Sequence, residues 1–186
     1  MLESPLAALS LAVRTMAKKR PKGEEDEHNR KTHTFSTRQT TMIEFPVIVP
    51  ITVRWGDMDA FGHVNNTCYF RYFEQARMAY FQQTMSEDPG VMPDGVGPIL
   101  HTTSCRFRAP VKHPDTLHVG ARVRSLEQDR FEMVYRVYSE QLDRIAADGE
   151  ALIVAYDYAN QAKGRMPAEW INAIEALEGR KLLTDG

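Results

Sequence analysis

The sequence has little cysteine, no long apolar run and no excess of positive charge. Its 186 residues include only two cysteines, Cys68 and Cys105, which excludes a disulfide framework and leaves no CxxC pair for zinc. No stretch approaches the roughly 18 consecutive apolar residues of a membrane-spanning helix. Lys and Arg number 23 against 25 Asp and Glu, so a broad basic field for nucleic acid is lacking. We therefore expect no nucleic-acid partner, no membrane span and no metal site.

The first 41 residues differ in character from the rest of the chain. They carry eight Lys or Arg and five Asp or Glu, whereas the remainder carries fifteen and twenty. Between Lys18 and Thr41, Phe35 is the only large apolar residue, so this stretch cannot bury enough surface to offset its ordering entropy. We expect residues 1–41 to be a disordered extension, or an artefact of a translation start that lies at Met42. Residues 42–186 then form one domain with its own core.

The N-terminal segment does not have the features of a targeting sequence. Glu3 precedes the apolar stretch 5–16, at a place where a secretion signal carries basic residues. The acidic run that follows at 24–27 fits a mitochondrial presequence poorly. We therefore expect a cytoplasmic protein.

Alternation of apolar and polar residues predicts five strands. The first covers 47–55, and Pro50 indicates that it is an edge strand because proline cannot donate to a neighbouring strand. In the last strand we expect a bulge near Gly149. The other four predicted strands are 99–108, 117–123, 131–137 and 145–158.

Two helices are predicted, one long and one short. The long helix runs from Thr67 to about Met85, and the short one begins at Pro167 and ends at Gly179. The order of strand, long helix and four strands predicts an α+β fold in which a sheet wraps one aromatic-rich helix. The core-facing stripe of the long helix consists of Tyr69, Phe73, Ala76 and Tyr80.

Residues 54–77, RWGDMDAFGHVNNTCYFRYFEQAR, combine an acid with the start of the long helix. Asp59 lies between the edge strand and that helix, and Gly62 allows a sharp turn. The backbone N–H groups from His63 to Thr67 are unpaired donors that favour negative charge. They would polarise a carbonyl and stabilise its oxyanion, while Asp59 attacks the carbonyl or deprotonates water. The segment predicts an acyl-transfer or hydrolysis site.

This segment resembles the hotdog-fold acyl-CoA thioesterases of the 4-hydroxybenzoyl-CoA thioesterase type. The shared pattern is a GDxDxxGHVNN loop followed by a helix with Tyr69-Phe70, Phe73-Glu74 and Ala76-Arg77. The resemblance covers about residues 45–160 and implies a curved antiparallel sheet around one long central helix. It also implies that an acyl-CoA thioester is hydrolysed to free acid and CoA without a metal or a cofactor.

The resemblance assigns the catalytic roles within the loop. The second acid, Asp59, would be the general base or nucleophile, and the backbone N–H seven residues later, on Asn66, would be the oxyanion donor. Two alternatives stay open, since Asp57 would react if the loop pointed the other way, and Glu74 matches the helix acid of some relatives. The family implies a homodimer, or a dimer-of-dimers tetramer, with active sites at the subunit interface.

Further residues are expected around the substrate. His63 is either a general acid or a structural residue, and Asn65 or Asn66 caps the helix. Gly62, Asn65 and Tyr69 are candidate substrate-binding residues. Arg106, Arg108 and Lys112 either bind CoA phosphates or form a solvated strand face.

Other functions stay open at this point. An acyl-carrier protein is an alternative thioester donor. A dehydratase or hydratase of the same fold would pair His63 with an acid. A non-catalytic module would bind acyl-CoA without turnover.

Overall fold

The computed structural model describes residues 38, 40–85 and 95–184. Of the expected extension 1–41, only residues 38, 40 and 41 are described, so its nature stays a prediction. No helix in these described ranges is long and apolar enough to cross a membrane.

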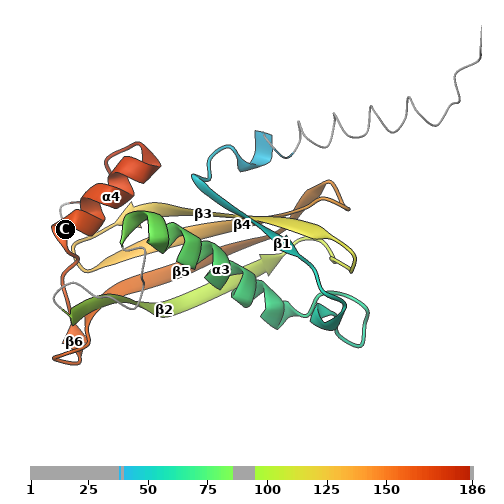
Figure 1. Cartoon of the computed structure of the whole chain (residues 1–186), viewed down its shortest axis with the longest axis horizontal. Helices are drawn as coiled ribbons and strands as arrows, with labels where there is room; N and C mark the ends of the chain where they lie inside the picture. Colours follow the sequence, from blue (N-terminus) through green and yellow to red (C-terminus); the bar gives the residue numbers. More distant parts are fainter. Residues whose placement is uncertain (1–37, 39, 86–94, 185–186) are drawn as a thin grey trace, which may run out of the picture. The chain divides into compact units, whose positions relative to one another are not determined.

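The described chain forms an antiparallel sheet with an edge strand at each side (Figure 1). The order of the long strands is β1-β3-β4-β5-β2, and β6 pairs with β5. β1 pairs with β3 alone among the described strands, which confirms the edge position indicated by Pro50. The strands are β1 (Val47–Thr52), β2 (Val96–Phe107), β3 (Thr116–Leu126), β4 (Arg130–Ser139), β5 (Arg144–Asp157) and β6 (Ala162–Lys163).

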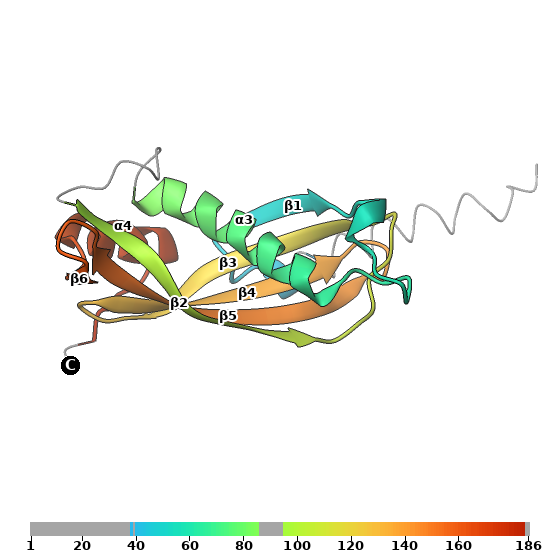
Figure 2. The same cartoon turned by 90° about the horizontal axis from the view of Figure 1, so that it is seen from below.

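The long helix α3 (Asn66–Thr84) lies against the inner face of the curved sheet (Figure 2). The predicted stripe of Tyr69, Phe73, Ala76 and Tyr80 is buried, because apolar residues at this spacing share one helix face. The ring of Phe73 stacks on Tyr135 of β4 with centroids 4.8 Å apart. The curved sheet around one central helix confirms the predicted fold.

Gly149 and the bulge of β5 lie at different positions in the strand and have different structural roles. A Cβ at Gly149 would lie less than 3.0 Å from the Phe73 ring, so glycine is required there for the helix to approach the sheet. The expected bulge is three residues away, at Ala146, where the pairing moves from Val137–Ala147 to Tyr138–Ile145. A glycine in a strand marks either a bulge or a close approach, and the sequence does not distinguish the two.

The short helix α4 (Ala168–Glu178) follows the sheet and packs through Trp170 and Ile174. It ends at Gly179, whose φ of 65° lies in the left-handed region that favours glycine. The Glu178 carboxylate accepts hydrogen bonds from the Tyr80 hydroxyl at 2.7 Å and the Val123 N–H at 2.6 Å. These bonds fix the end of α4 to both α3 and β3.

The prediction that the first strand reaches Trp55 is wrong. β1 ends at Thr52, and Trp55 begins a single 3₁₀ turn, η1 (Trp55–Asp57), in which its side chain is 75% exposed. The turn is held by Asp57, whose Oδ2 accepts the Arg54 N–H at 2.9 Å. The local hydrogen bond therefore overrides the alternating pattern.

The residues just before β1, here called the N-terminal strap (residues 40–46), pack on the outer face of the sheet. Met42 and Phe45 form a small buried cluster with Tyr138. Gly120 of β3 lies directly beneath, and a Cβ there would be 2.6 Å from the Phe45 ring. The glycine thus allows the strap to lie close to the sheet.

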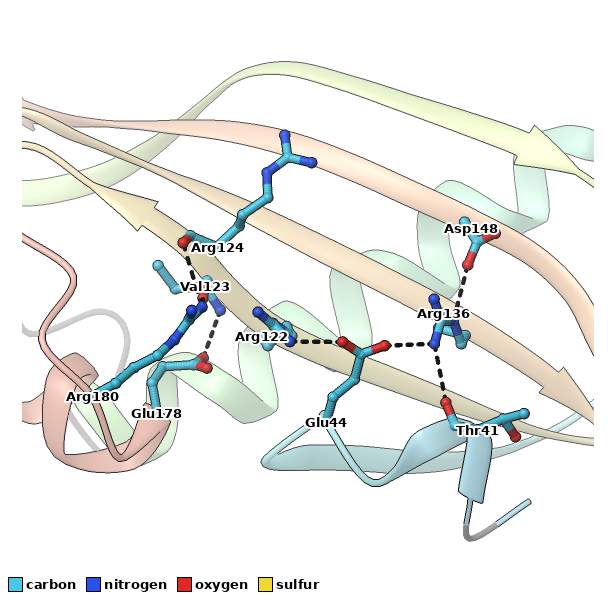
Figure 3. Close-up of polar contacts among 9 residues, drawn as sticks. All are labelled: Thr41, Glu44, Arg122, Val123, Arg124, Arg136, Asp148, Glu178 and Arg180. Atoms are coloured by element: carbon cyan, nitrogen blue, oxygen red, sulfur yellow. Dashed lines mark hydrogen bonds and ion pairs between the residues drawn. The ribbon is translucent and has the colours of Figure 1, made fainter. Parts of the chain in front are cut away.

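Ion pairs also join the N-terminal strap to the sheet (Figure 3). The Glu44 carboxylate binds Arg122 at 2.8 Å and Arg136 at 2.6 Å. Arg136 also donates to the Thr41 carbonyl at 3.1 Å and to Asp148 at 3.1 Å. The strap is therefore joined to β3 and β4 by charged contacts as well as by apolar packing.

Candidate active site

The loop between β1 and α3 folds back on itself around Asp59. The Asp59 N–H donates to the His63 carbonyl at 2.9 Å, and the Gly62 N–H donates to the Asp59 carbonyl at 2.9 Å. Met58 and Val64 form an isolated antiparallel bridge at the base of the loop. Gly62 has a φ of 73°, so the turn requires the conformational freedom of glycine. The loop thus holds Asp59 in a defined position.

One oxygen of the Asp59 carboxylate is used within the loop and the other is available. Oδ1 accepts the Phe61 N–H at 2.9 Å in an Asx turn. Oδ2 has no hydrogen-bond partner among the described residues. The Asx turn therefore orients the carboxylate and leaves one oxygen free for a substrate or a water.

The start of α3 supplies an unpaired backbone donor. The Asn65 side chain caps the helix by accepting from the Thr67 N–H at 3.0 Å, which confirms a predicted cap. The Asn65 N–H donates to the Asp57 carbonyl at 2.8 Å. Within the described chain, no oxygen accepts the N–H of Asn66, the first residue of the helix. This N–H lies where the partial positive charge of the helix N-terminus is concentrated.

Asp59 and Asn66, the first residue of α3, line the same pocket, which has a volume of about 490 Å³. Tyr69 is buried at the pocket, and burial raises the pKa of its hydroxyl to about 12, so the hydroxyl stays a neutral donor. Its ring meets Phe107 edge to face, with centroids 5.1 Å apart. The lining consists of Asp59, Val64, Asn66, Tyr69, Phe107, Arg108, Ala109 and Pro110.

The two alternative acids face a different cavity. Asp57 Oδ2 accepts from the Tyr72 hydroxyl at 3.0 Å in addition to the Arg54 N–H. Burial, followed by this bond to Asp57, raises the pKa of Tyr72 strongly. Asp57 and the exposed Glu74 line a cavity of about 480 Å³ that does not include Asp59 or Asn66. The structure therefore separates these acids from the Asn66 N–H.

The remaining predicted residues are distributed unevenly. His63 is partly buried, and its ring neither lines the Asp59 pocket nor forms a hydrogen bond within the described chain. Arg108 lines the pocket and pairs with Asp148. Arg106 lies with Arg108 at a cavity of about 560 Å³ on the outer face of the sheet. Lys112 is exposed and lines neither cavity.

Phe107 is a pocket residue that the sequence reasoning missed. The alternation in its strand placed it on the same face as Cys105, but nothing indicated that this strand end would reach the loop. It is half-exposed at the end of β2, opposite Tyr69. Among the described residues, no three His, Cys, Asp or Glu side chains gather in a way that could hold a metal ion.

Comparisons with known proteins place the chain in a family. The family model described as the thioesterase-like superfamily matches residues 53–174. A crystal structure of a thioesterase from Thermus thermophilus, complexed with coenzyme A and Zn, is 29% identical with a TM-score of 0.65, covering 76% of this chain and all of that one. The PA5185 protein from Pseudomonas aeruginosa is 27% identical with a TM-score of 0.63, covering 77% of this chain and 97% of that one.

A shorter match is found with the YsmA protein of Bacillus subtilis. It is 43% identical over 87 residues, which is 46% of this chain and 56% of the relative. The match thus spans just over half of that relative. Because the family model covers most of the described domain, including the Asp59 loop, the chain belongs to the thioesterase-like superfamily and is a thioester hydrolase with a hotdog fold.

Proposed function

We propose that the protein hydrolyses acyl-CoA thioesters in the pocket between Asp59 and Asn66. The observation that carries the proposal is that the free Oδ2 of Asp59 and the unpaired N–H of Asn66 belong to residues lining one pocket. An acid and an oxyanion donor on opposite sides of a carbonyl are what acyl transfer to water requires.

The thioester carbonyl oxygen binds the Asn66 N–H, and the carbonyl carbon becomes more electrophilic. Asp59 takes a proton from water while the water oxygen bonds to that carbon. The tetrahedral adduct then collapses, the C–S bond breaks, and CoA leaves as a thiolate that receives the proton. In the nucleophilic variant, Asp59 itself bonds to the carbon, the C–S bond breaks as CoA leaves as a thiolate, and water then hydrolyses the resulting mixed anhydride and supplies the proton for the thiolate. The neutral Tyr69 hydroxyl is an additional donor at the pocket.

Arg106 and Arg108 are proposed to bind the CoA phosphates. Arg108 lies at both the Asp59 pocket and the outer cavity, and Arg106 lies only at the outer cavity. A guanidinium binds phosphate oxygens in a bidentate manner. The Thermus thermophilus relative, which was crystallised with coenzyme A, supports CoA over an acyl-carrier protein as the donor. Lys112 is exposed, and we propose that it contributes less to phosphate binding than the two arginines.

The proposed assembly is a homodimer, or a pair of such dimers, that pairs through β2. This strand pairs with β5 alone among the described strands, and it exposes Ile99, Leu100 and Phe107. A long edge strand with exposed apolar residues is a template for a second chain. Since Phe107 also lines the Asp59 pocket, a partner at this edge would help to close the pocket.

The test compares two carboxylates that are changed in the same way. Asp59→Asn is expected to lose thiol release from acyl-CoA by about 10²- to 10⁴-fold, because the base or nucleophile is removed. Glu74→Gln is the matched control, since Glu74 is exposed at the other cavity. Thiol release is followed with a chromogenic thiol reagent across short, long and aromatic acyl-CoAs.

Retained activity in Asp59→Asn would exclude the mechanism. Binding of acyl-CoA without turnover by the wild-type protein would indicate the non-catalytic module. Hydration of an enoyl-CoA in place of thiol release would indicate the hydratase. That alternative is weakened because the His63 ring does not line the pocket.

A further inference from the structure

Arg77 of α3 is a buried cation with no counterion in the part of the chain that the structure describes. The residue is only 8% exposed. Its one hydrogen bond within the described chain runs from Nη1 to the Tyr135 hydroxyl at 3.4 Å, and no described carboxylate pairs with it. A buried charge is ordinarily paired, because a neutral partner does not compensate for the lost hydration. The guanidinium therefore has donors for an acceptor that the described chain does not supply.

The neighbours of Arg77 do not supply this acceptor. Burial raises the pKa of Tyr135, so its hydroxyl is uncharged, and it donates to the Met133 sulfur at 3.6 Å. Glu74, three residues earlier on the helix, is exposed and forms no ion pair with Arg77. A purely structural role for the charge thus has no visible partner in the described part of the domain.

Arg77 lies on the same helix face as the proposed oxyanion donor. Phe70, Phe73 and Arg77 follow Asn66 by four, seven and eleven residues, which is the spacing of one stripe along α3. At 1.5 Å per residue, Asn66 and Arg77 are about 16 Å apart along the helix axis. The arginine side chain leans back toward the helix N-terminus, which shortens this gap.

The exposed side chain between the two residues on this stripe, that of Phe70, is apolar, whereas Phe73 beside it is fully buried. Phe70 is 37% exposed and meets Phe73 edge to face, with centroids 6.2 Å apart. An acyl chain whose carbonyl is at Asn66 can therefore lie across the exposed Phe70 ring with its far end toward Arg77. A methyl end would leave the guanidinium unpaired, whereas a carboxylate would pair with it through two parallel hydrogen bonds.

We infer that Arg77 binds a carboxylate at the far end of the acyl group, so that the preferred substrates are CoA monothioesters of dicarboxylic acids. Arg77 is then a specificity residue that takes no part in breaking the thioester bond. The inference rests on the proposed function, because it takes the Asn66 N–H as the position of the thioester carbonyl.

The test uses pairs of acyl-CoAs of equal length that end in a carboxylate or in a methyl group. At the acyl length that the wild-type protein hydrolyses best, its kcat/KM for the carboxylate-ended substrate is expected to exceed that for the methyl-ended substrate by about tenfold or more. This is the size expected for a hydrogen bond to a charged group. Arg77→Met should lose this preference and keep its activity on the methyl-ended substrates. The variant is expected to fold, because an apolar side chain of similar volume is tolerated in place of a buried charge.

Arg71→Met is the matched control, since Arg71 is exposed on the other flank of α3, at the Asp57 cavity. It should keep the preference for the carboxylate. Equilibrium binding of non-hydrolysable thioether analogues of both kinds gives the same comparison without turnover. Asp59→Asn should retain the binding preference while losing thiol release from both substrates, which separates failure of the catalytic proposal from failure of this one.

Three results would overturn the inference. One is a wild-type protein that shows no preference at any length, in both turnover and analogue binding. Another is an Arg77→Met variant that loses activity equally on both kinds of substrate, which indicates packing alone. The last is an Arg77→Met variant that becomes monomeric by light scattering, which would assign Arg77 to a carboxylate of a second copy of the chain.

Discussion

The Tyr72 hydroxyl donates to Asp57 Oδ2 across 3.0 Å and thereby joins the second turn of α3 to the turn η1. The same carboxylate oxygen accepts the Arg54 N–H, and the Asp57 carbonyl accepts the Asn65 N–H. Asp57 thus joins the end of β1, the helix cap and the helix body. The loop that carries Asp59 is held between these fixed points.

Removal of the Tyr72 hydroxyl should loosen this arrangement. Tyr72→Phe is expected to lower the free energy of unfolding by about 2 kcal/mol, since a hydrogen bond to a charged group is lost. Thiol release should also slow, because the Asp59 loop is less well held. The measurements are urea unfolding and steady-state kinetics. Tyr156→Phe is the control, as the Tyr156 hydroxyl has no hydrogen bond among the described residues; an equal loss in both variants would contradict the prediction.

The Asn66 N–H can be removed without changing the helix. Proline is favoured at the first position of a helix, and Asn65 has the extended backbone, φ −58° and ψ 139°, that a following proline requires. Asn66→Pro should therefore fold and lose about 10²- to 10³-fold in kcat through loss of the oxyanion donor. Asn66→Ala keeps the N–H and should stay near the wild-type rate. Normal turnover by a folded Asn66→Pro variant would show that this N–H is not the donor.

Gly149→Ala tests the close contact between helix and sheet. The added methyl group would collide with the Phe73 ring, so we expect a loss of about 1 to 3 kcal/mol in the free energy of unfolding. Phe73→Leu in the same chain should recover part of this loss, because it removes the ring. Gly56→Ala is the control, since apart from its chain neighbours no described residue has an atom within 4 Å of the Cβ position there. Unchanged stability of Gly149→Ala in urea unfolding would refute the predicted collision.

Acid should weaken the contact between α4 and the C-terminal segment. Glu175 accepts from Lys181 Nζ at 2.6 Å and from the N–H groups of Leu182 and Leu183, which lowers its pKa from 4.5 to about 2. The carboxylate is thus more acidic in the folded state, and its contribution to stability is present above pH 4.5 and lost as the pH falls toward about 2.

The measurement is thermal unfolding of the wild type and of Glu175→Gln over this pH range. The stability difference between them should shrink as the pH falls from 4.5 toward 2. Glu169→Gln changes an exposed glutamate of the same helix and should show no such trend. A difference that stayed constant with pH would count against the role assigned to the Glu175 charge.

The fold could be predicted from periodicity because each element buries one face. The stripe of Tyr69, Phe73, Ala76 and Tyr80 indicated both the helix and its buried side, and Pro50 indicated the edge strand. The errors occur where a local hydrogen bond decides the geometry. Trp55 continued the alternating pattern of the strand, but the Asp57 turn takes it into solvent. The bulge of β5 lies three residues from its predicted position at Gly149. Gly149 instead makes room for an aromatic ring, and a sequence does not reveal which ring approaches.

The site could be predicted only in part, for a related reason. Asp59, Gly62, Asn65 and Asn66 are close in sequence, so their arrangement follows from the loop and the helix start. The position of Phe107 and the separation of Arg106 from Lys112 depend on how β2 passes the loop, which is a long-range relationship. The catalytic role of Asp59 stays a prediction until its variants are assayed.

The N-terminal strap affects how the outer faces of the sheets of two molecules could pack against each other. Its packing on Gly120, Arg122 and Arg136 already covers the β3 and β4 half of the outer face with the chain's own residues. The other half presents Arg106, Arg108 and Arg124 around the outer cavity, where Arg108 and Arg124 are paired with acidic side chains. Stacking two such surfaces would bury these charged groups, and we expect broad stacking of outer faces to be disfavoured relative to association along the β2 edge.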